Sequence, residues 1–416
     1  MIETDICIIG AGSAGLMAGC FAAAGSKKVV IVESNTTAGR KLLLTGRGRC
    51  NLTHTGTIDE FIMAYKPFDR FVRHCIHELS PDNLRKFFAR RGLETIVEPS
   101  GCVFPKSRRA GDIKRILLEE LKKLNVRILY GTKVRSIKKH NETFVILSEK
   151  FKISSRSVII STGGVSWPQT GSTGDGCRFA QSFGHNIIEP KACLVPLVTA
   201  EKFCSSLAGV GVKNVRIFCT IDGRKISAAG PMIFTHNGIG GPAVFNLSRI
   251  AADRLYKSKK NLTISIDLLP DIKPDQLDKK LIACFAQHAG QTVVSILAQL
   301  LPRGFARQLC IENHLEKIHA GQINRNMRKN LIGKLKNFPL SVVSTEPLER
   351  ATVTRGGICT AQIDPKTMQS RLCNGLFFAG ELINVDGPCG GYNLQFAFSS
   401  GFLAGKSAVE LLDKIA

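Results

Sequence analysis

The stretch Asp5-Ile-Cys-Ile-Ile-Gly10-Ala-Gly-Ser-Ala-Gly15 decides the fold of this chain. Residues 5–9 predict a short buried strand, the glycines a tight turn, and residues 16–24 a helix of small side chains. Gly10 permits the turn, Gly12 leaves room for a pyrophosphate, and Gly15 lets the helix pack closely on the strand. The helix then directs free amides and the positive end of its dipole at the phosphates. The predicted phosphate-binding residues are Gly10, Gly12, Ser13, Ala14 and Gly15.

A second apolar strand follows at residues 28–33 and ends in Glu33, with Ser34 next to it. An acidic residue at this place holds the adenosine ribose of a dinucleotide. A lone GxGxxG pattern is weak, but the complete strand–turn–helix–strand–acid unit predicts dinucleotide binding strongly. Gly39, Arg40 and Lys41 come next, where a turn and a cation can meet the pyrophosphate; the alternative is a solvated basic loop.

The other end of the chain favours FAD over NAD. Residues 374–379 predict a buried strand ending in Gly380 and Glu381, and a loop then leads to a helix that opens with Gly390, Gly391, Tyr392 and Asn393. In two-part FAD folds such a segment returns to the first sheet, where its acid takes ribityl hydroxyls and its helix N-terminus faces the flavin. A turn at Thr162, Gly163 and Gly164 follows another apolar strand and is expected near the FAD, or else is a simple strand-end turn.

Five separated motifs, in order, resemble one family, the BaiN-like (YhiN-like) flavoproteins, also described as NAD(P)/FAD-dependent or aminoacetone-oxidase-family oxidoreductases. The motifs are residues 10–19, 39–51, 161–176, 234–242 and 379–400. The resemblance implies an α/β fold with a glutathione-reductase-type FAD domain, built from both ends of the chain and interrupted by an insert. It also implies reduction of conjugated C=C bonds, which is linked to bile-acid intermediates in one branch and to a uridine of ribosomal RNA in another.

The chain is expected to divide into an FAD-binding part at residues 1–193, an insert at 194–343 with a β-rich and a helical part, and a second FAD-binding part at 344–416. Prolines near both ends of the insert support these boundaries. No second GxGxxG unit is present, so no dedicated NAD(P) domain is expected. NADPH or NADH, the expected electron donor, would visit the flavin transiently.

Cys50 is the first candidate for a catalytic group. It stands between Arg49 and Asn51, where cations are expected to lower the thiol pKa and where the thiol could protonate a substrate carbon. The alternative is packing beneath the flavin. Cys389, beside the glycines of the last helix, is the rival. His236 matches a family motif on the insert and is a second catalytic candidate, although a structural role fits equally. Trp167 could stack on a base, but a core role is favoured.

Lysine and arginine total 57 against 33 acidic residues, a net charge of +24. Such an excess favours a polyanionic partner, or else reflects a generally lysine-rich proteome. Two local clusters could contact phosphates or be solvated surfaces. The candidate substrate contacts are Arg47, Arg49, Arg108, Arg109, Arg325, Arg328 and Lys329.

The 14 cysteines are scattered singly, without metal-ligand spacing, so reduced thiols and no metal site are expected. No signal peptide or membrane span is evident, and a cytoplasmic protein is expected. We expect an FAD-dependent oxidoreductase that reduces a ribosomal RNA uridine to dihydrouridine. The alternatives are an NAD(P)H-dependent reductase of a small enoate or enone, and a flavin-bound RNA-binding factor without redox turnover. The oligomeric state stays open.

Overall fold

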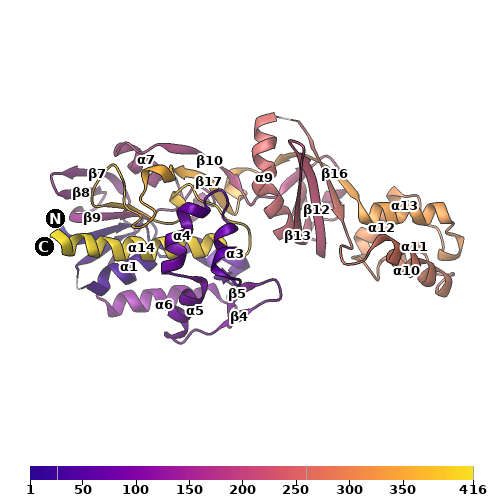
Figure 1. Cartoon of the computed structure of the whole chain (residues 1–416), viewed down its shortest axis with the longest axis horizontal. Coiled ribbons are helices and arrows are strands. Elements are labelled where there is room, and N and C mark those ends of the chain that lie inside the picture. The colour runs from indigo at the N-terminus through magenta and orange to yellow at the C-terminus, as the bar shows by residue number, and fades with distance from the viewer. Residues whose placement is uncertain (26, 259, 416) are drawn as a thin grey trace. The chain divides into compact units, whose positions relative to one another are not determined.

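The computed structural model describes residues 1–25, 27–258 and 260–415, and the chain divides into two compact units (Figure 1). The first unit comprises Met1–Ala192 and Thr352–Ala416, and the second comprises Cys193–Ala351. The sequence placed the end of the insert at residue 343. This position lies inside strand β16 (Phe338–Thr345), whose last residue still pairs with Leu197 of the second unit. This ladder holds the whole strand in the second unit.

A mostly parallel sheet forms the centre of the first unit. Its strands are β1 (Ile2–Ile9), β2 (Val29–Val32), β6 (Arg127–Leu129), β7 (Val134–His140), β8 (Thr143–Ser148), β9 (Lys152–Ile160) and β18 (Leu376–Phe378). The order is β6-β2-β1-β9-β8-β7, and β18 pairs with the end of β9 that β8 leaves free. Residues 6–9 and 29–32 are entirely buried, as strands covered on both faces must be. The predicted α/β class is confirmed.

Helices α1 (Ser13–Ala22) and α14 (Tyr392–Ile415) lie side by side on this sheet (Figure 1). A Cβ at Gly401 would lie 2.2 Å from the Ala14 carbonyl oxygen, and one at Gly405 would lie 2.4 Å from that of Ala18. The two backbones therefore approach each other where only glycine fits. This contact joins the two ends of the described chain.

The remaining elements of the first unit surround this layer. They are the small sheet β3 (Thr53–His54), β5 (Cys102–Pro105) and β4 (Thr95–Val97), the strands β10 (Ile187–Cys193) and β17 (Val353–Ile358), and the helices α2 (Arg40–Leu44), α3 (Ile58–Met63), α4 (Asp69–Glu78), α5 (Pro81–Ala89), α6 (Ala110–Lys123) and α7 (Asp175–Ser182). Local sequence fixes some of their ends: Thr57 and Glu60 form a capping box at the start of α3.

The second unit contains a closed barrel and a group of helices. The barrel order is β11 (Leu197–Thr199), β14 (Gly238–Gly240), β13 (Arg224–Thr235), β12 (Gly211–Ile221), β15 (Leu262–Asp267) and β16. Val215, Ile217 and Cys219 point into the core while their neighbours are more exposed, the period of two expected for a strand. The helices are α8 (Phe203–Ser206), α9 (Pro242–Ser258), α10 (Pro274–Gln287), α11 (Val293–Leu297), α12 (Arg303–Glu312) and α13 (Arg325–Lys336).

No helix in the described part of the chain has the length and apolar character needed to span a bilayer.

Candidate functional site

The glycine turn between β1 and α1 has two crowded positions and one open position. Gly10 has φ of 101°, and a Cβ there would lie 2.7 Å from the Ser161 carbonyl oxygen. A Cβ at Gly15 would lie 1.9 Å from the Gly10 carbonyl oxygen, whereas one at Gly12 would meet no described atom within 4 Å. Gly12 also begins α1 without a side-chain cap among the described residues. An uncapped helix start facing open space suits an anion.

Glu33 lies directly after β2, at the same edge of the sheet, and is 7% exposed. Its Oε2 accepts a hydrogen bond of 2.7 Å from the Ala11 amide, and its Oε1 accepts one of 2.8 Å from the Asn35 amide. The Ser34 hydroxyl donates to Oε1 at 3.4 Å. The carboxylate therefore fastens the glycine turn to the end of the second strand.

The segment after Glu33 returns to the turn. Gly39 has φ of 67°, and its amide donates to the Ala11 carbonyl oxygen at 2.9 Å. Arg40 is exposed and donates to Asn35 Oδ1 at 2.7 Å. Arg40 is thus held beside the turn with its guanidinium in solvent.

Lys41 and Glu381, predicted to contact different parts of the cofactor, contact each other. Lys41 Nζ lies 2.5 Å from Glu381 Oε2 and 2.7 Å from the Ser166 hydroxyl. The Thr354 amide donates to Glu381 Oε1 at 2.7 Å. Burial alone would raise the pKa of the Glu381 carboxyl, but Lys41, Thr354 and Ser166 together hold it below its usual value. This group joins α2 to the segment that leaves β18.

The turn at residues 162–164 follows β9 and lies against the glycine turn. The Ser161 hydroxyl donates to the carbonyl oxygens of Ile9 and Gly10, at 3.1 and 3.0 Å. Gly163 has φ of 77°, and a Cβ at Gly164 would lie 2.4 Å from Thr354 Oγ1. Thr162 Oγ1 is buried and has no hydrogen-bond partner among the described residues. A buried hydroxyl without a hydrogen-bond partner is unfavourable, and a bound ligand could supply that partner.

The late segment approaches α1 and β3. Gly380 has φ of 78°, and a Cβ there would lie 2.9 Å from Ala14 Cβ. A Cβ at Gly391 would lie 2.4 Å from the Thr53 carbonyl oxygen. Gly390 also has a positive φ, of 129°. Asn393 folds the preceding loop, since its side chain accepts from the Gly387 amide at 2.8 Å and donates to the Gly387 carbonyl oxygen at 2.9 Å.

Tyr392, the first residue of α14, packs among aromatic rings. Its ring is stacked on Phe61 with centroids 4.5 Å apart and on His54 with centroids 5.1 Å apart. The contacts at Thr53 and His54 place the chain that follows Cys50 beside the start of α14.

Cys50 is fully buried with a left-handed φ of 60°, and its amide donates to the Thr45 carbonyl oxygen at 2.9 Å. Burial raises the pKa of its thiol to about 12, although a hydrogen bond with the Thr45 side chain lowers this pKa by a smaller amount. The prediction that neighbouring cations lower this pKa is wrong, because Arg47 is exposed and Arg49 is engaged elsewhere. The thiol is protonated at neutral pH, as a proton donor requires.

Two predicted substrate contacts meet on one carboxylate. Arg49 Nη1 lies 3.2 Å and Arg108 Nη1 2.8 Å from Glu98 Oε1. The guanidinium of Arg49 also lies 4.5 Å from the centroid of the Phe104 ring. Arg109 is exposed at the start of α6. Two cations on one carboxylate leave a positive charge at this edge of the first unit.

Cys389 and Trp167 are half-buried in the first unit. The pKa of the Cys389 thiol is raised to about 12, mainly by burial and to a smaller extent by the nearby Cys102. Trp167 has a left-handed φ of 54° and begins a short 3-10 helix, where its carbonyl oxygen accepts a hydrogen bond of 2.7 Å from the Thr170 hydroxyl.

The remaining candidates lie in the second unit. His236 is exposed between β13 and β14. Arg325 and Lys329 are exposed on α13, but Arg328 is 16% exposed and lies 2.6 Å from Asp278 Oδ1 of α10. Arg328 therefore ties two helices together, which corrects its assignment to a surface that is free for phosphates.

A family model described as the HI0933-like protein Rossmann domain matches residues 4–407. The chain belongs to this family. The resemblance to BaiN-like flavoproteins is thereby confirmed, and this HI0933-like protein is an FAD-dependent oxidoreductase.

Two curated relatives match nearly the whole of this HI0933-like chain. A 3-dehydro-bile acid Δ4,6-reductase from Clostridium scindens is 32% identical over 97% of this chain and 98% of its own length. A ribosomal RNA dihydrouridine synthase from Escherichia coli is 28% identical over 98% of this chain and 99% of its own. A solved 3-ketosteroid-Δ4-(5α)-dehydrogenase from Rhodococcus jostii, 16% identical, has a similar fold, with a TM-score of 0.52 and coverage of 98% and 97%.

The residues of the HI0933-like chain fit a bound FAD. The open space at Gly12, the uncapped start of α1 and the unpartnered Thr162 hydroxyl occur along one edge of the sheet. Glu33 lies at the same edge, at the end of the neighbouring strand. These are the features that a pyrophosphate and a ribose require.

Sequence reasoning missed one arrangement, the ion pair between Arg355 of β17 and Asp386. Arg355 Nε and Nη2 each donate to the carboxylate at 2.9 Å, and Asp386 is 0% exposed. Gly356 and Gly357 follow with φ of 101° and 113°. The sequence Thr-Arg-Gly-Gly could have indicated this close approach, because adjacent glycines of this kind mark crowded backbone. The pair fixes the loop that precedes Gly390.

Proposed function

We propose that this protein reduces an electron-poor C=C bond, and that its substrate is a uridine in ribosomal RNA, which becomes dihydrouridine. NADPH or NADH is the proposed electron donor. The net charge of +24 carries the choice of RNA, since a phosphodiester chain needs such a surface and a neutral small molecule does not. The name of the Escherichia coli relative supports the same substrate.

The proposed reaction site is the segment from Thr45 to His54 beside the start of α14. Two observations support it: the close approach of the Thr53 carbonyl oxygen to Gly391, and the Arg49–Glu98–Arg108 group at its edge. In this arrangement the two arginines would hold a phosphate of the substrate while Cys50 lies within the same segment.

Bound FAD supplies hydride chemistry for one carbon of the double bond. Cys50 would hold a proton on Sγ for the neighbouring carbon, and its raised pKa keeps that proton in place until a strongly basic carbon forms. Glu33 and Thr162 would hold the ribose and the pyrophosphate side of the cofactor. Gly390 and Gly391 allow the amides at the start of α14 to face the cofactor ring.

The second candidate function is reduction of a small conjugated enone. The 32% identity to the 3-dehydro-bile acid Δ4,6-reductase, higher than that to the dihydrouridine synthase, favours it. The same type of bond, an electron-poor C=C, would be reduced with the same residues. The two functions differ in whether the basic surface is needed for turnover.

The test begins with anaerobic addition of NADPH or NADH to the holoenzyme, which should bleach the flavin absorbance. Unmodified ribosomal RNA and a conjugated steroid enone are then added separately. We expect RNA to restore the colour, and nucleoside mass analysis to find uridine heavier by two hydrogens. Reoxidation by the enone alone would favour the second candidate. A flavin that no donor bleaches would favour a non-redox RNA-binding factor.

A further inference from the structure

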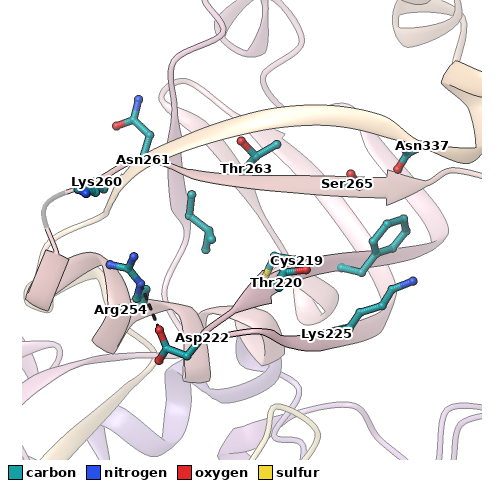
Figure 2. A pocket seen from close by; sticks show the side chains of 12 residues that line it. Cys219, Thr220, Asp222, Lys225, Arg254, Lys260, Asn261, Thr263, Ser265 and Asn337 are labelled. Carbon is teal, nitrogen blue, oxygen red and sulfur yellow. Dashed lines mark ion pairs between the residues drawn. The ribbon is translucent and has the colours of Figure 1, made fainter.

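A polar groove opens on the barrel of the second unit, between β12 and β15 (Figure 2). Its volume is about 630 Å³. Among the described residues, these two strands pair only at Arg216–Asp267, Ile217–Ile266 and Phe218–Ser265. Beyond these pairs β12 continues along β13, and β15 continues along β16. The two strands therefore separate, and the groove occupies the gap.

The walls of the groove carry neutral polar side chains. Figure 2 shows Thr220 on one strand and Thr263 and Ser265 on the other, with Asn337 at one end. These side chains offer neutral donors and acceptors. Polar groups in a gap between strands suit a ligand that needs hydrogen bonds along its length.

The charges of the groove are mainly positive. Its lining includes Lys225, Arg254 and Lys260, against a single carboxylate, Asp222, which lies 3.8 Å from Arg254 Nε (Figure 2). These lining residues together carry a net charge of +2, which favours an anionic ligand.

An aromatic ring lies beside these cations. Phe218 is half-buried, and Lys225 Nζ lies 4.7 Å from the centroid of its ring. Because the ammonium group lies over the ring, a base that stacks on this face would displace it toward the adjoining phosphate.

We propose that this groove binds a single-stranded segment of RNA, with its backbone along Lys225 and Lys260 and a base stacked on Phe218. The inference rests on the proposed function, because it assigns a second contact surface to the same RNA. A single strand fits better than a duplex, whose bases are stacked inside and cannot reach a half-buried ring. A peptide without acidic residues would need no cluster of cations.

The test measures the binding of a fluorescent uridine-rich RNA of about ten nucleotides to the holoenzyme by anisotropy, at several salt concentrations. We expect the double variant Lys225→Glu/Lys260→Glu to bind at least roughly tenfold more weakly and to reduce the slope of log K against log salt by about 1.4. Phe218→Ala should weaken binding by roughly fivefold or more, whereas the salt slope should not change.

Lys202 and Lys213 provide the matched control, since both are exposed in the second unit and neither lines the groove. Lys202→Glu/Lys213→Glu makes the same change in net charge and should weaken binding much less. Flavin absorbance and thermal melting check that every variant is folded. Phe218→Leu separates packing from stacking, because it keeps the apolar contact without the ring and should bind like Phe218→Ala.

The groove proposal is overturned if the groove variants bind like the control. It is also overturned if uridine monophosphate competes as well as the strand at equal phosphate concentration and Phe218→Ala has no effect, because the groove would then bind a free anion. The protein could bind RNA through the groove and yet reduce only the enone. That result would contradict the proposed function and support the groove proposal. Uridine reduction that survives in variants without groove binding would support the proposed function and would contradict the groove as a contact surface for the substrate RNA.

Discussion

Gly12 and Gly15 belong to one short turn, yet their surroundings are opposite. The position of a Cβ at Gly15 is filled by the Gly10 carbonyl oxygen, 1.9 Å away, whereas the position at Gly12 is open. Substitution at Gly15 must therefore move the backbone. Substitution at Gly12, whose φ of −79° any residue adopts, places a side chain where the pyrophosphate would bind.

We expect Gly12→Leu to fold normally and to purify without flavin, because a Cβ at this position meets no described atom within 4 Å whereas the side chain would exclude the pyrophosphate. Gly15→Ala should lose about 1–3 kcal/mol of unfolding free energy through overpacking. Absorbance near the flavin band and urea denaturation measure the two effects. A yellow Gly12→Leu protein, or one that carries FMN, would contradict the assignment of this turn to FAD.

Cys50 shows how burial reverses an expectation drawn from neighbouring residues. Adjacent arginines in the sequence suggested a lowered thiol pKa, but the thiol is buried in the core whereas Arg47 is exposed and Arg49 pairs with Glu98. A protonated thiol can donate a proton, and it is a poor nucleophile.

Cys50→Ala should keep its FAD and its reduction by NAD(P)H, whereas reoxidation by the substrate should slow by roughly 10²-fold, as loss of a general acid does. Stopped-flow absorbance separates these two half-reactions. Cys389→Ala is the matched comparison. Normal reoxidation in Cys50→Ala would assign the thiol to packing and direct attention to Cys389 or His236.

At the scale of elements, the Lys41–Glu381 pair connects a short helix to a segment that lies far away in the chain. The folded pKa of Glu381 lies below its unfolded value, so the unfolded chain binds more protons as the pH falls. The contribution of the pair is therefore present above the unfolded pKa and is lost as the pH falls through the folded pKa.

We expect Lys41→Met to lower the unfolding free energy by about 1–2 kcal/mol at pH 7, because a largely buried carboxylate loses its cation. The deficit should shrink as the pH falls below about 4.3, where the unfolded carboxyl becomes protonated. Denaturant titrations at pH 7 and at a pH below about 4.3 measure this deficit in unfolding free energy. Lys122→Met, on the exposed face of α6, is the control. An equal deficit at both pH values would show that the ammonium–carboxylate interaction is not its source.

The sequence was most informative where neighbours in the chain are neighbours in space. The β1–α1–β2 unit and Glu33 follow from spacing alone, since the turn and the strand are local. Arg328 could not be assigned in this way, because its partner Asp278 lies on another helix. The Arg355–Asp386 pair depends in the same way on a strand and a loop that only the folded chain brings together.

For the whole molecule, the distribution of charge matters more than its sum. Five cations lie on α13. Arg328 and Lys336 form ion pairs with Asp278 and Asp267, Lys334 is half-buried, and Arg325 and Lys329 are exposed. An RNA-binding surface on this helix can use Arg325 and Lys329 without breaking the ion pairs of Arg328 and Lys336.

Arg325→Glu/Lys329→Glu should weaken RNA binding and flatten its salt slope by about 0.7 for each phosphate that the helix no longer neutralises, with flavin content and NAD(P)H oxidation unchanged. Arg328→Glu should instead lower the melting temperature of the second unit, because two carboxylates would then face each other. Binding isotherms and calorimetry measure these effects. Unaltered RNA modification in the double variant would make this part of α13 an ordinary solvated surface.

The glycine contact between α1 and α14 also has a consequence for synthesis. The first unit cannot close until residues 392–415 have left the ribosome, although its first strand and helix emerge at the start. The second unit, continuous in sequence, is complete earlier and can fold while the first waits. A chain that lacks α14 would lack the partner of α1. We expect such a chain to bind FAD poorly, so cofactor binding should follow the docking of α14.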